Sequence, residues 1–148
     1  MADADSIRKI AHQRAQELKL PYAGALLPQE ACALMDAGAR LVDVRTKAEL
    51  EWVGRVPGSL AIEWNSWPGG KANPDFISQL EAQASKDAVV MFLCRSGGRS
   101  HGAAVAAAKA GFTNSYNVLE GFEGDKNSKN HRNTTGGWRV AGLPWIQG

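Results

Sequence analysis

The chain has few of the residues that build disulfide frameworks or metal centres, with only two cysteines and three histidines among its 148 residues. Neither the cysteines, Cys32 and Cys94, nor the histidines show the spacing of metal ligands. The sequence therefore predicts no metal site. A disulfide between the two cysteines is an alternative that their separation in the sequence and a reducing compartment both disfavour.

An excess of one charge and long apolar runs are also absent. The formal net charge is +2, from 17 basic and 15 acidic residues, which is too small and too evenly spread to indicate a nucleic-acid or membrane partner. No apolar run approaches the roughly 20 residues that a membrane-spanning helix needs. The first residues, Met1 to Asp5, are acidic and lack the apolar core of a secretory signal. We therefore expect a cytoplasmic protein.

Short apolar runs alternate with helical patterns along the chain, which is typical of an α/β fold with an open parallel sheet and helices on both faces. Helices are predicted over residues 5–20, 28–37, 46–52, 74–84 and 102–110, and strands over residues 41–44, 59–62, 88–93 and 115–118. We assign residues 1–25 to an N-terminal helical extension packed on the domain and residues 26–148 to the domain itself.

The most informative segment joins the apolar run of residues 88–93 to the alanine-rich helix predicted over residues 102–110. It reads Cys94-Arg95-Ser96-Gly97-Gly98-Arg99-Ser100. A cysteine at the exit of a parallel strand lies where open α/β sheets bind their ligands. Loop amides, the helix dipole and two arginines all favour the thiolate form. We therefore predict that Cys94 is a catalytic nucleophile facing an anionic substrate, and not simply a small buried core residue.

Three segments together resemble the rhodanese family of sulfurtransferases. They are the loop above, the stretch Leu41-Val42-Asp43-Val44-Arg45 with Glu49 and Gly54-Arg55-Val56-Pro57-Gly58-Ser59, and Gly137-Trp138-Arg139 with Ala141-Gly142-Leu143-Pro144. The resemblance covers roughly residues 27 to 146 and implies a rhodanese-like open parallel sheet of five strands with helices on both faces. Two features depart from the family pattern: Arg55 stands where many members have a histidine, and residues 125–135 form a polar insert. We interpret the insert as a solvated loop, with a lid or docking loop as the alternative.

The resemblance implies a thiosulfate sulfurtransferase that works without a cofactor. Cys94 would take sulfane sulfur from thiosulfate, or from another persulfide donor, and pass it as a persulfide to cyanide, a small thiol or a protein thiol. The residues expected to bind the substrate are Arg95, Ser96, Gly97, Gly98, Arg99 and Ser100. Arg99 could instead pair with a carboxylate. His101, in the first turn of the helix, either tunes the thiolate or is simply solvated.

Two other functions remain open. A cysteine phosphatase or arsenate reductase would need five residues between its cysteine and its arginine, whereas four separate Cys94 from Arg99. The smaller loop fits a sulfur atom better than a phosphoryl group. The second alternative is a sulfur-carrier or redox-sensing module that does not turn over small molecules, because an exposed reactive thiol is also what an oxidant attacks.

Charged and aromatic residues outside the loop have a more structural interpretation. Asp43 and Arg45 are predicted to form an ion pair beside a buried strand, with Glu49 as a further member, because buried charges need partners. The five tryptophans are assigned to the core or to a pocket wall. Of these, Trp64 or Trp67 is expected to border the site, since both follow the end of a predicted strand.

Overall fold

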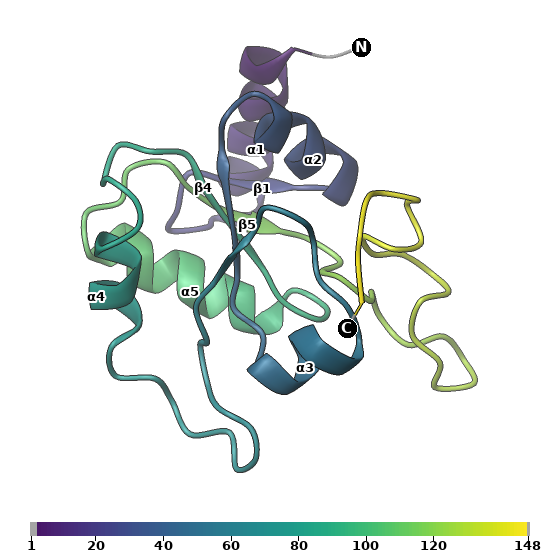
Figure 1. Cartoon of the computed structure of the whole chain (residues 1–148). Helices are drawn as coiled ribbons and strands as arrows, with labels where there is room; N and C mark the ends of the chain where they lie inside the picture. The colour runs from purple at the N-terminus through teal and green to yellow at the C-terminus, as the bar shows by residue number, and fades with distance from the viewer. Residues whose placement is uncertain (1–2, 148) are drawn as a thin grey trace.

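Five short strands form a parallel sheet in the order β1-β5-β4-β2-β3, and the computed structural model describes residues 3–147 (Figure 1). The strands are β1 (Gly24–Leu26), β2 (Arg40–Asp43), β3 (Leu60–Ala61), β4 (Val90–Leu93) and β5 (Ser115–Val118). The helices are α1 (Ala4–Leu18), α2 (Pro28–Asp36), α3 (Lys47–Trp52), α4 (Phe76–Glu81) and α5 (Gly98–Lys109). The predicted α/β class with an open parallel five-stranded sheet is confirmed. Residues 1, 2 and 148, which the predicted extension and domain include, lie outside the described residues.

Side chains of the central strand β4 alternate between the two faces of the sheet, as the pleat requires. Met91 and Leu93 belong to one apolar cluster, which also contains residues of α1 and α2. Phe92 and Cys94 belong to the other, which contains residues of α4 and α5. The sheet is therefore covered on both faces, as predicted, and Cys94 lies on the α5 side.

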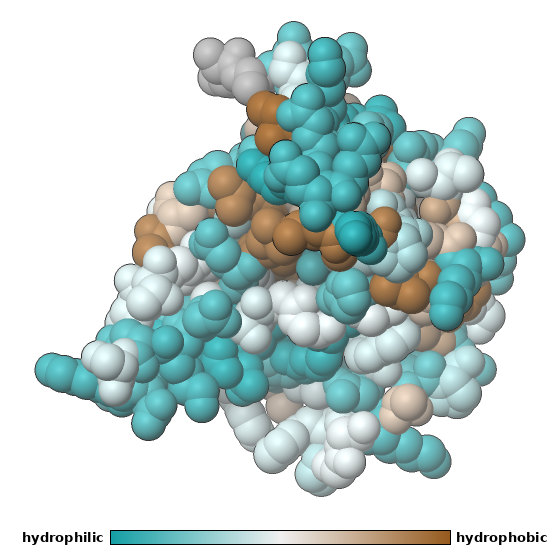
Figure 2. Space-filling model, turned by 180° about the vertical axis from the view of Figure 1, so that it is seen from behind, coloured by the Kyte–Doolittle hydropathy of each residue, from teal (hydrophilic) through white to brown (hydrophobic). Residues whose placement is uncertain are grey.

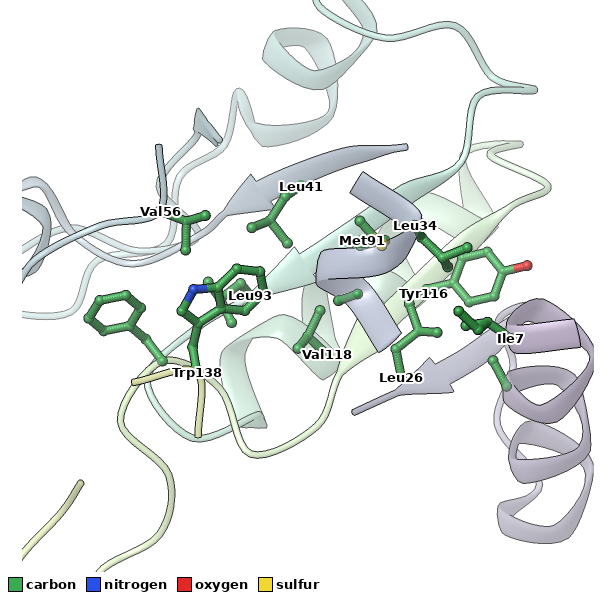
Figure 3. Packing of buried hydrophobic residues seen from close by; sticks show 13 residues of the cluster. Ile7, Leu26, Leu34, Leu41, Val56, Met91, Leu93, Tyr116, Val118 and Trp138 are labelled. Carbon is green, nitrogen blue, oxygen red and sulfur yellow. The ribbon is translucent and has the colours of Figure 1, made fainter. Parts of the chain in front are cut away.

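The first cluster is closed at one end by the C-terminal part of the chain. Figure 3 shows Trp138 among the side chains that the sheet presents on this face, near Leu93 and Val56. Trp138 is fully buried, and its indole N–H donates to the carbonyl oxygen of Pro144 at 2.8 Å. The buried tryptophan thus fixes the C-terminal segment against the strand that leads into the Cys94 loop.

The N-terminal helix packs directly on the edge strand of the sheet. A Cβ atom at Gly24 of β1 would lie 2.8 Å from the backbone carbonyl of Ala11, so only glycine permits this close approach. Ile7, Ala11 and Ala15 form the buried side of α1. Seen from behind in Figure 2, brown hydrophobic side chains gather beneath the hydrophilic surface of this helix. Within residues 3–147, no helix combines the length and apolar composition of a membrane span.

The residue pattern predicts every helix and four of the five strands, with boundaries that shift by a few residues. The strand it does not predict is β1, whose three buried residues are too few to show a period of two. Helix α5 begins at Gly98, four residues before the predicted start, because the first turn is built from the loop itself. Helix α4 begins at Phe76, two residues later than predicted.

Candidate active site

The Cys94 loop leaves the carboxyl end of the central strand and runs straight into a helix. β4 ends at Leu93 and α5 begins at Gly98. The loop therefore lies at the carboxyl end of the sheet, where its neighbouring strands are β2 and β5. Gly97 is the N-cap residue of α5 and has a φ of 116°, a conformation that favours glycine. In Figure 1 the loop lies between the N-terminal end of α5 and helix α3.

The Cys94 sulfur receives two contacts from the start of α5. The Gly97 amide N–H donates to Sγ at 3.0 Å, and the Ser100 hydroxyl oxygen lies 3.3 Å from Sγ. Cys94 is only 1% exposed. A helix N-terminus carries partial positive charge, so these contacts place the sulfur where a negative charge is stabilised.

Arg99 is held by a carboxylate and does not face the sulfur as an open cation. Its guanidinium donates to both carboxylate oxygens of Glu49 on α3, at 2.7 and 2.9 Å. Glu49 also accepts from the backbone N–H and the hydroxyl of Thr46, the N-cap residue of α3. The structural pairing of Arg99 that the sequence left open is therefore the arrangement found, and Glu49 is its partner.

The charges of this pair stabilise each other. Burial alone raises the pKa of Glu49, but the bonds and charge from Arg99, together with the bonds from Thr46, outweigh burial and lower it to about 2. The hydrogen bond to Glu49 raises the pKa of Arg99 above its ordinary value. The pair is ionised at neutral pH and joins α3 to the first turn of α5 across the loop.

Asp43 and Arg45 form a separate and fully buried ion pair. Arg45 Nε and Nη2 donate to the Asp43 carboxylate at 2.9 and 2.7 Å, and Nη2 also donates to the Gly54 carbonyl oxygen at 2.8 Å. The guanidinium carbon lies 4.2 Å from the centre of the Phe122 ring. The prediction of a structural pair is confirmed, but its extension to Glu49 is wrong, because Glu49 binds Arg99 instead.

A pocket of about 390 Å³ opens beside the loop, between α3 and the segment after β3. The loop contributes Arg95 and Arg99 to its wall, whereas the sulfur-bearing Cys94 is not among the lining residues. Trp67 also lines it, as predicted for a tryptophan bordering the site. Arg95 is exposed, and its side chain makes no hydrogen bond or ion pair within residues 3–147.

Two of the tryptophans, Trp52 and Trp67, line this pocket, as their assignment to the core or a pocket wall predicts. Trp52 is 71% exposed and Trp67 is 67% exposed, because each stands at the rim of the pocket. Trp64 is half-buried and packs edge-on against Phe76, 5.0 Å between ring centres. Only Trp138 is fully enclosed among the tryptophans of residues 3–147.

The segment after β5 holds the loop from behind. The Phe122 N–H donates to the Cys94 carbonyl oxygen at 2.8 Å, and the Glu123 N–H donates to the Arg95 carbonyl oxygen at 3.0 Å. Gly121 lies so close that a Cβ atom there would be 2.5 Å from the Arg95 carbonyl carbon and oxygen. The backbone of the loop is thus fixed independently of its side chains.

The sequence does not predict Asn117 and Tyr22 as site residues, and it leaves the role of His101 open. The Ser100 hydroxyl lies 2.6 Å from Asn117 Oδ1, and Tyr22 Oη lies 2.8 Å from His101 Nδ1. Asn117 could be noticed in the sequence, because it is an amide within a buried strand. The sequence does not indicate that its partner is Ser100. His101 is exposed as a residue, yet one ring nitrogen is bonded, so it is not simply solvated.

The remaining predicted residues make fewer contacts. Ser96 is half-buried and Gly98 is exposed. Both cysteines are free, so the alternative of a Cys32–Cys94 disulfide is not what the structure contains. Cys32 is half-buried on α2, where burial raises the pKa of its thiol.

Comparison with known proteins gives consistent matches. A family model described as a rhodanese-like domain matches residues 27–128. An uncharacterized protein of Rickettsia conorii is 37% identical over 110 residues, which cover 72% of this chain and 82% of that protein. The thiosulfate sulfurtransferase GlpE of Pseudomonas aeruginosa is 33% identical over 98 residues, covering 66% of this chain and 79% of its own length. A crystal structure of a protein from M. tuberculosis has a TM-score of 0.78 and 41% identity, over 86% of this chain and 99% of that chain.

Proposed function

The chain belongs to the rhodanese-like domain family, and from this premise we propose that it is a thiosulfate sulfurtransferase that carries sulfane sulfur on Cys94. The observation that carries the proposal is the position of the Cys94 sulfur, 3.0 Å from the Gly97 amide at the N-terminus of α5. The same donor that stabilises a thiolate would stabilise the terminal sulfur of a persulfide, whose charge lies one bond further out.

The reaction proceeds in two balanced displacements. The Cys94 thiolate attacks the outer sulfur of thiosulfate, a sulfur–sulfur bond forms, and the original sulfur–sulfur bond breaks to release sulfite with the electron pair. Cyanide or a thiolate then attacks the outer sulfur of the persulfide and leaves with it, which regenerates the Cys94 thiolate. Neither step needs an external oxidant or reductant.

The burial of Cys94 favours a donor with a small terminal sulfur. With 1% of its surface exposed, Cys94 can be approached only by a terminal atom of a narrow donor. The outer sulfur of thiosulfate meets this requirement, whereas the phosphorus of a phosphate ester is shielded by four oxygens. Arg95 stands exposed at the rim of the adjacent pocket, where it would attract the sulfonate end of the donor.

The pairing of Arg99 argues against phosphatase chemistry. A phosphatase arginine must present its guanidinium to the phosphate oxygens in the transition state. Here both outer nitrogens of Arg99 donate to Glu49, so the charge of the guanidinium is already balanced by a carboxylate. The short loop and this pairing support sulfur transfer over phosphoryl transfer.

The acceptor side is open to cyanide, a small thiol or a protein thiol. We place the reaction in the cytoplasm, because a free thiol that must return to its reduced form in each cycle is best maintained in a reducing compartment. Cys32 and Cys94 are both free, which is compatible with that setting.

The test is the mass of the intact protein after treatment with thiosulfate, for the wild type, Cys94→Ser and the matched control Cys32→Ser. We expect the wild type and Cys32→Ser to gain the mass of one sulfur atom, and cyanide to remove it with release of thiocyanate. Cys94→Ser should gain nothing. An adduct that persists in the presence of cyanide and thiols would favour a carrier or sensor, and an adduct on Cys94→Ser would refute the assignment of the nucleophile.

A further inference from the structure

The pocket beside the Cys94 loop is larger than the ions that the proposed reaction handles. Its volume of about 390 Å³ lies within the range of about 300–1,000 Å³ that is typical of sites for small organic ligands. Thiosulfate and cyanide are ions of a few atoms and would leave most of this volume to water. The pocket therefore has room for a molecule with an organic body.

One wall of the pocket is helix α3, which is held in place although it buries no residue in the core. Its first turn is fixed by the ion pair of Glu49 with Arg99. At its other end, the Gln147 side chain donates to the carbonyl oxygen of Trp52 at 2.7 Å. The backbone is therefore fixed at both ends, whereas the Trp52 side chain is left 71% exposed.

The other wall is a turn after β3 that presents a second exposed tryptophan. The Ser66 N–H donates to the Lys71 carbonyl oxygen at 2.9 Å, and the Gly70 N–H donates to the Ser66 carbonyl oxygen at 3.0 Å, so the turn is closed by its own backbone. Trp67, within this turn, is 67% exposed. Covering the apolar surface of an indole is favourable, so a ligand that covers either tryptophan gains stabilisation that the free protein leaves unused.

The charge of the pocket wall favours a ligand with a carboxylate. Three charged residues line the pocket, and two of them, Glu49 and Arg99, neutralise each other. The third is Arg95, whose exposed side chain makes no hydrogen bond or ion pair within residues 3–147. A guanidinium matches a carboxylate in charge and in geometry. Asn65 is half-buried in the wall, and its side-chain amide also makes no hydrogen bond in that part of the chain, so it can bind a further polar group.

The position of the pocket beside the Cys94 loop indicates that its ligand takes part in sulfur transfer. Figure 1 shows α3 and the turn after β3 at the end of the sheet where the loop lies. Arg95, in the pocket wall, directly follows Cys94 in the chain. Because Cys94 is only 1% exposed, a partner can bring no more than a terminal sulfur to it, and the body of that partner must stay outside. The pocket is a place for such a body.

We propose that this pocket binds the sulfur acceptor, and that the acceptor is an organic thiol with a flat apolar group against Trp52 and Trp67 and a carboxylate beside Arg95. The inference rests on the proposed role of Cys94 as the sulfur carrier. Sulfite leaves before the acceptor enters, so donor and acceptor use Arg95 in turn.

The transfer to such an acceptor is balanced. The acceptor thiolate attacks the outer sulfur of the Cys94 persulfide and forms a new sulfur–sulfur bond. The bond between the two sulfurs on Cys94 breaks, and its electron pair returns to Cys94 as the thiolate. The product is an organic persulfide, and no oxidant or reductant is consumed.

The test compares three thiols as acceptors from the isolated persulfide form of the protein, in a Cys32→Ser background. N-benzoylcysteine and N-acetylcysteine share a thiol and a carboxylate and differ in the aromatic ring, whereas the amide of N-benzoylcysteine lacks the carboxylate. The loss of one sulfur mass is followed with time at several concentrations of each thiol. We expect N-benzoylcysteine to half-saturate the protein at a concentration about threefold to tenfold lower than either of the other two, the effect of one aromatic or one charged contact.

Variants of the wall assign the two preferences to their residues. Trp67→Ala and Trp52→Ala should each reduce the preference for the aromatic ring, and Trp67→Phe, which keeps an aromatic face, should retain most of it. Arg95→Gln should remove the preference for the acid over the amide and retain the preference for the ring. Discharge of the persulfide by cyanide, measured in each variant, is the reference by which the thiol rates are divided. Leu18→Ala is the control, because Leu18 is 58% exposed on α1 and does not line the pocket. It should keep both preferences.

Equal half-saturation by the three thiols in the wild type would refute the pocket assignment, as would a ring preference that survives when both Trp52 and Trp67 are replaced by alanine. A second measurement separates this inference from the proposed function. The thioether S-methyl-N-benzoylcysteine cannot accept sulfur, and calorimetry measures its binding to the protein without persulfide. If the protein forms no persulfide but binds the thioether more tightly than the double alanine variant does, the pocket assignment stands and the proposed function is rejected. If the persulfide forms and the thioether binds both proteins equally, the proposed function stands and the pocket assignment is rejected.

Discussion

The two sides of the Cys94–Ser100 loop differ in how completely their polar groups are bonded. On the inner side, Ser100 and Asn117 are buried and bonded, and Arg99 is paired with Glu49. On the outer side, Arg95 is exposed and unpaired within residues 3–147, next to a pocket with an exposed tryptophan rim. One side of the loop is therefore a bonded interior, and the other is open to solvent beside the pocket.

This difference separates two tasks that the sequence presents as one motif. A reacting sulfur must be held within a fraction of an ångström, which rigid support from buried groups provides. A substrate must arrive from solvent, which needs unpaired charge and accessible surface. Arg95 and Arg99 lie four positions apart, yet Arg99 is paired with Glu49, and only the exposed Arg95 is proposed to attract the substrate. Substitutions on the two sides test that division, and the largest effect is expected at Gly121.

Gly121→Ala should disrupt the inner side most strongly. Its φ is +67°, and the added Cβ would lie 2.5 Å from the Arg95 carbonyl, where neither backbone can yield. We expect the free energy of unfolding to fall by more than about 3 kcal/mol, from the clash and the unfavourable φ together. Urea denaturation followed by circular dichroism measures this change.

Gly142→Ala is the matched control for that variant. Gly142 has a similar φ of +75°, but no atom lies within 4 Å of the added Cβ. Its cost should therefore be about 1 kcal/mol, the conformational term alone. Equal losses for the two variants would show that the loop is not held by close backbone contact at Gly121.

Much of this division could be predicted where the residues concerned are contiguous in the sequence. The strand, the cysteine, the glycines and the helix follow one another within residues 88–110, so local rules locate Cys94 at the carboxyl end of β4. The pairing of Asp43 with Arg45 could be predicted for the same reason. The two residues are only two positions apart at the end of one buried strand, so each has few other partners for its charge.

The inner contacts could not be predicted, because they join segments that the sequence keeps apart. Glu49 and Arg99 are 50 residues apart, and Tyr22 and His101 are 79 apart. Only the order of strands in the sheet brings them together. The exposure of Trp52 was missed for another reason: α3 is a six-residue helix with no buried residue, so it has no apolar face to assign.

Glu49→Gln should weaken the inner side by a smaller and pH-dependent amount. The pKa of Glu49 in the folded protein is about 2, below its ordinary value of 4.5. The stabilisation by the pair is therefore complete above about pH 4.5 and is lost as the pH falls toward about 2. We expect the variant to lose about 1 to 3 kcal/mol at pH 7 and to approach the wild type near pH 2.

The exposed pair of Glu81 with Lys86 supplies the control for Glu49→Gln, since its 3.2 Å contact lies in solvent. Glu81→Gln should change the free energy of unfolding by less than about 0.5 kcal/mol at any pH. A loss for Glu49→Gln that stays constant from pH 7 to about pH 2 would mean that the bond to Arg99 does not depend on the charge of Glu49.

Arg95→Gln should give the smallest change in free energy and act on binding alone. Because Arg95 is exposed and unpaired within residues 3–147, its removal should alter the stability by less than about 0.5 kcal/mol. The KM for thiosulfate should rise by about fivefold to tenfold, near 1 kcal/mol, while kcat is kept.

Arg95→Lys should retain most of the affinity, and added salt should narrow the gap in KM between the wild type and Arg95→Gln, because an exposed charge is screened. Arg99→Gln should show the opposite pattern, in which the free energy of unfolding falls more than the affinity for thiosulfate. If Arg95→Gln instead unfolds more readily and binds thiosulfate normally, the outer side is part of the scaffold and the two sides of the loop do not divide the work.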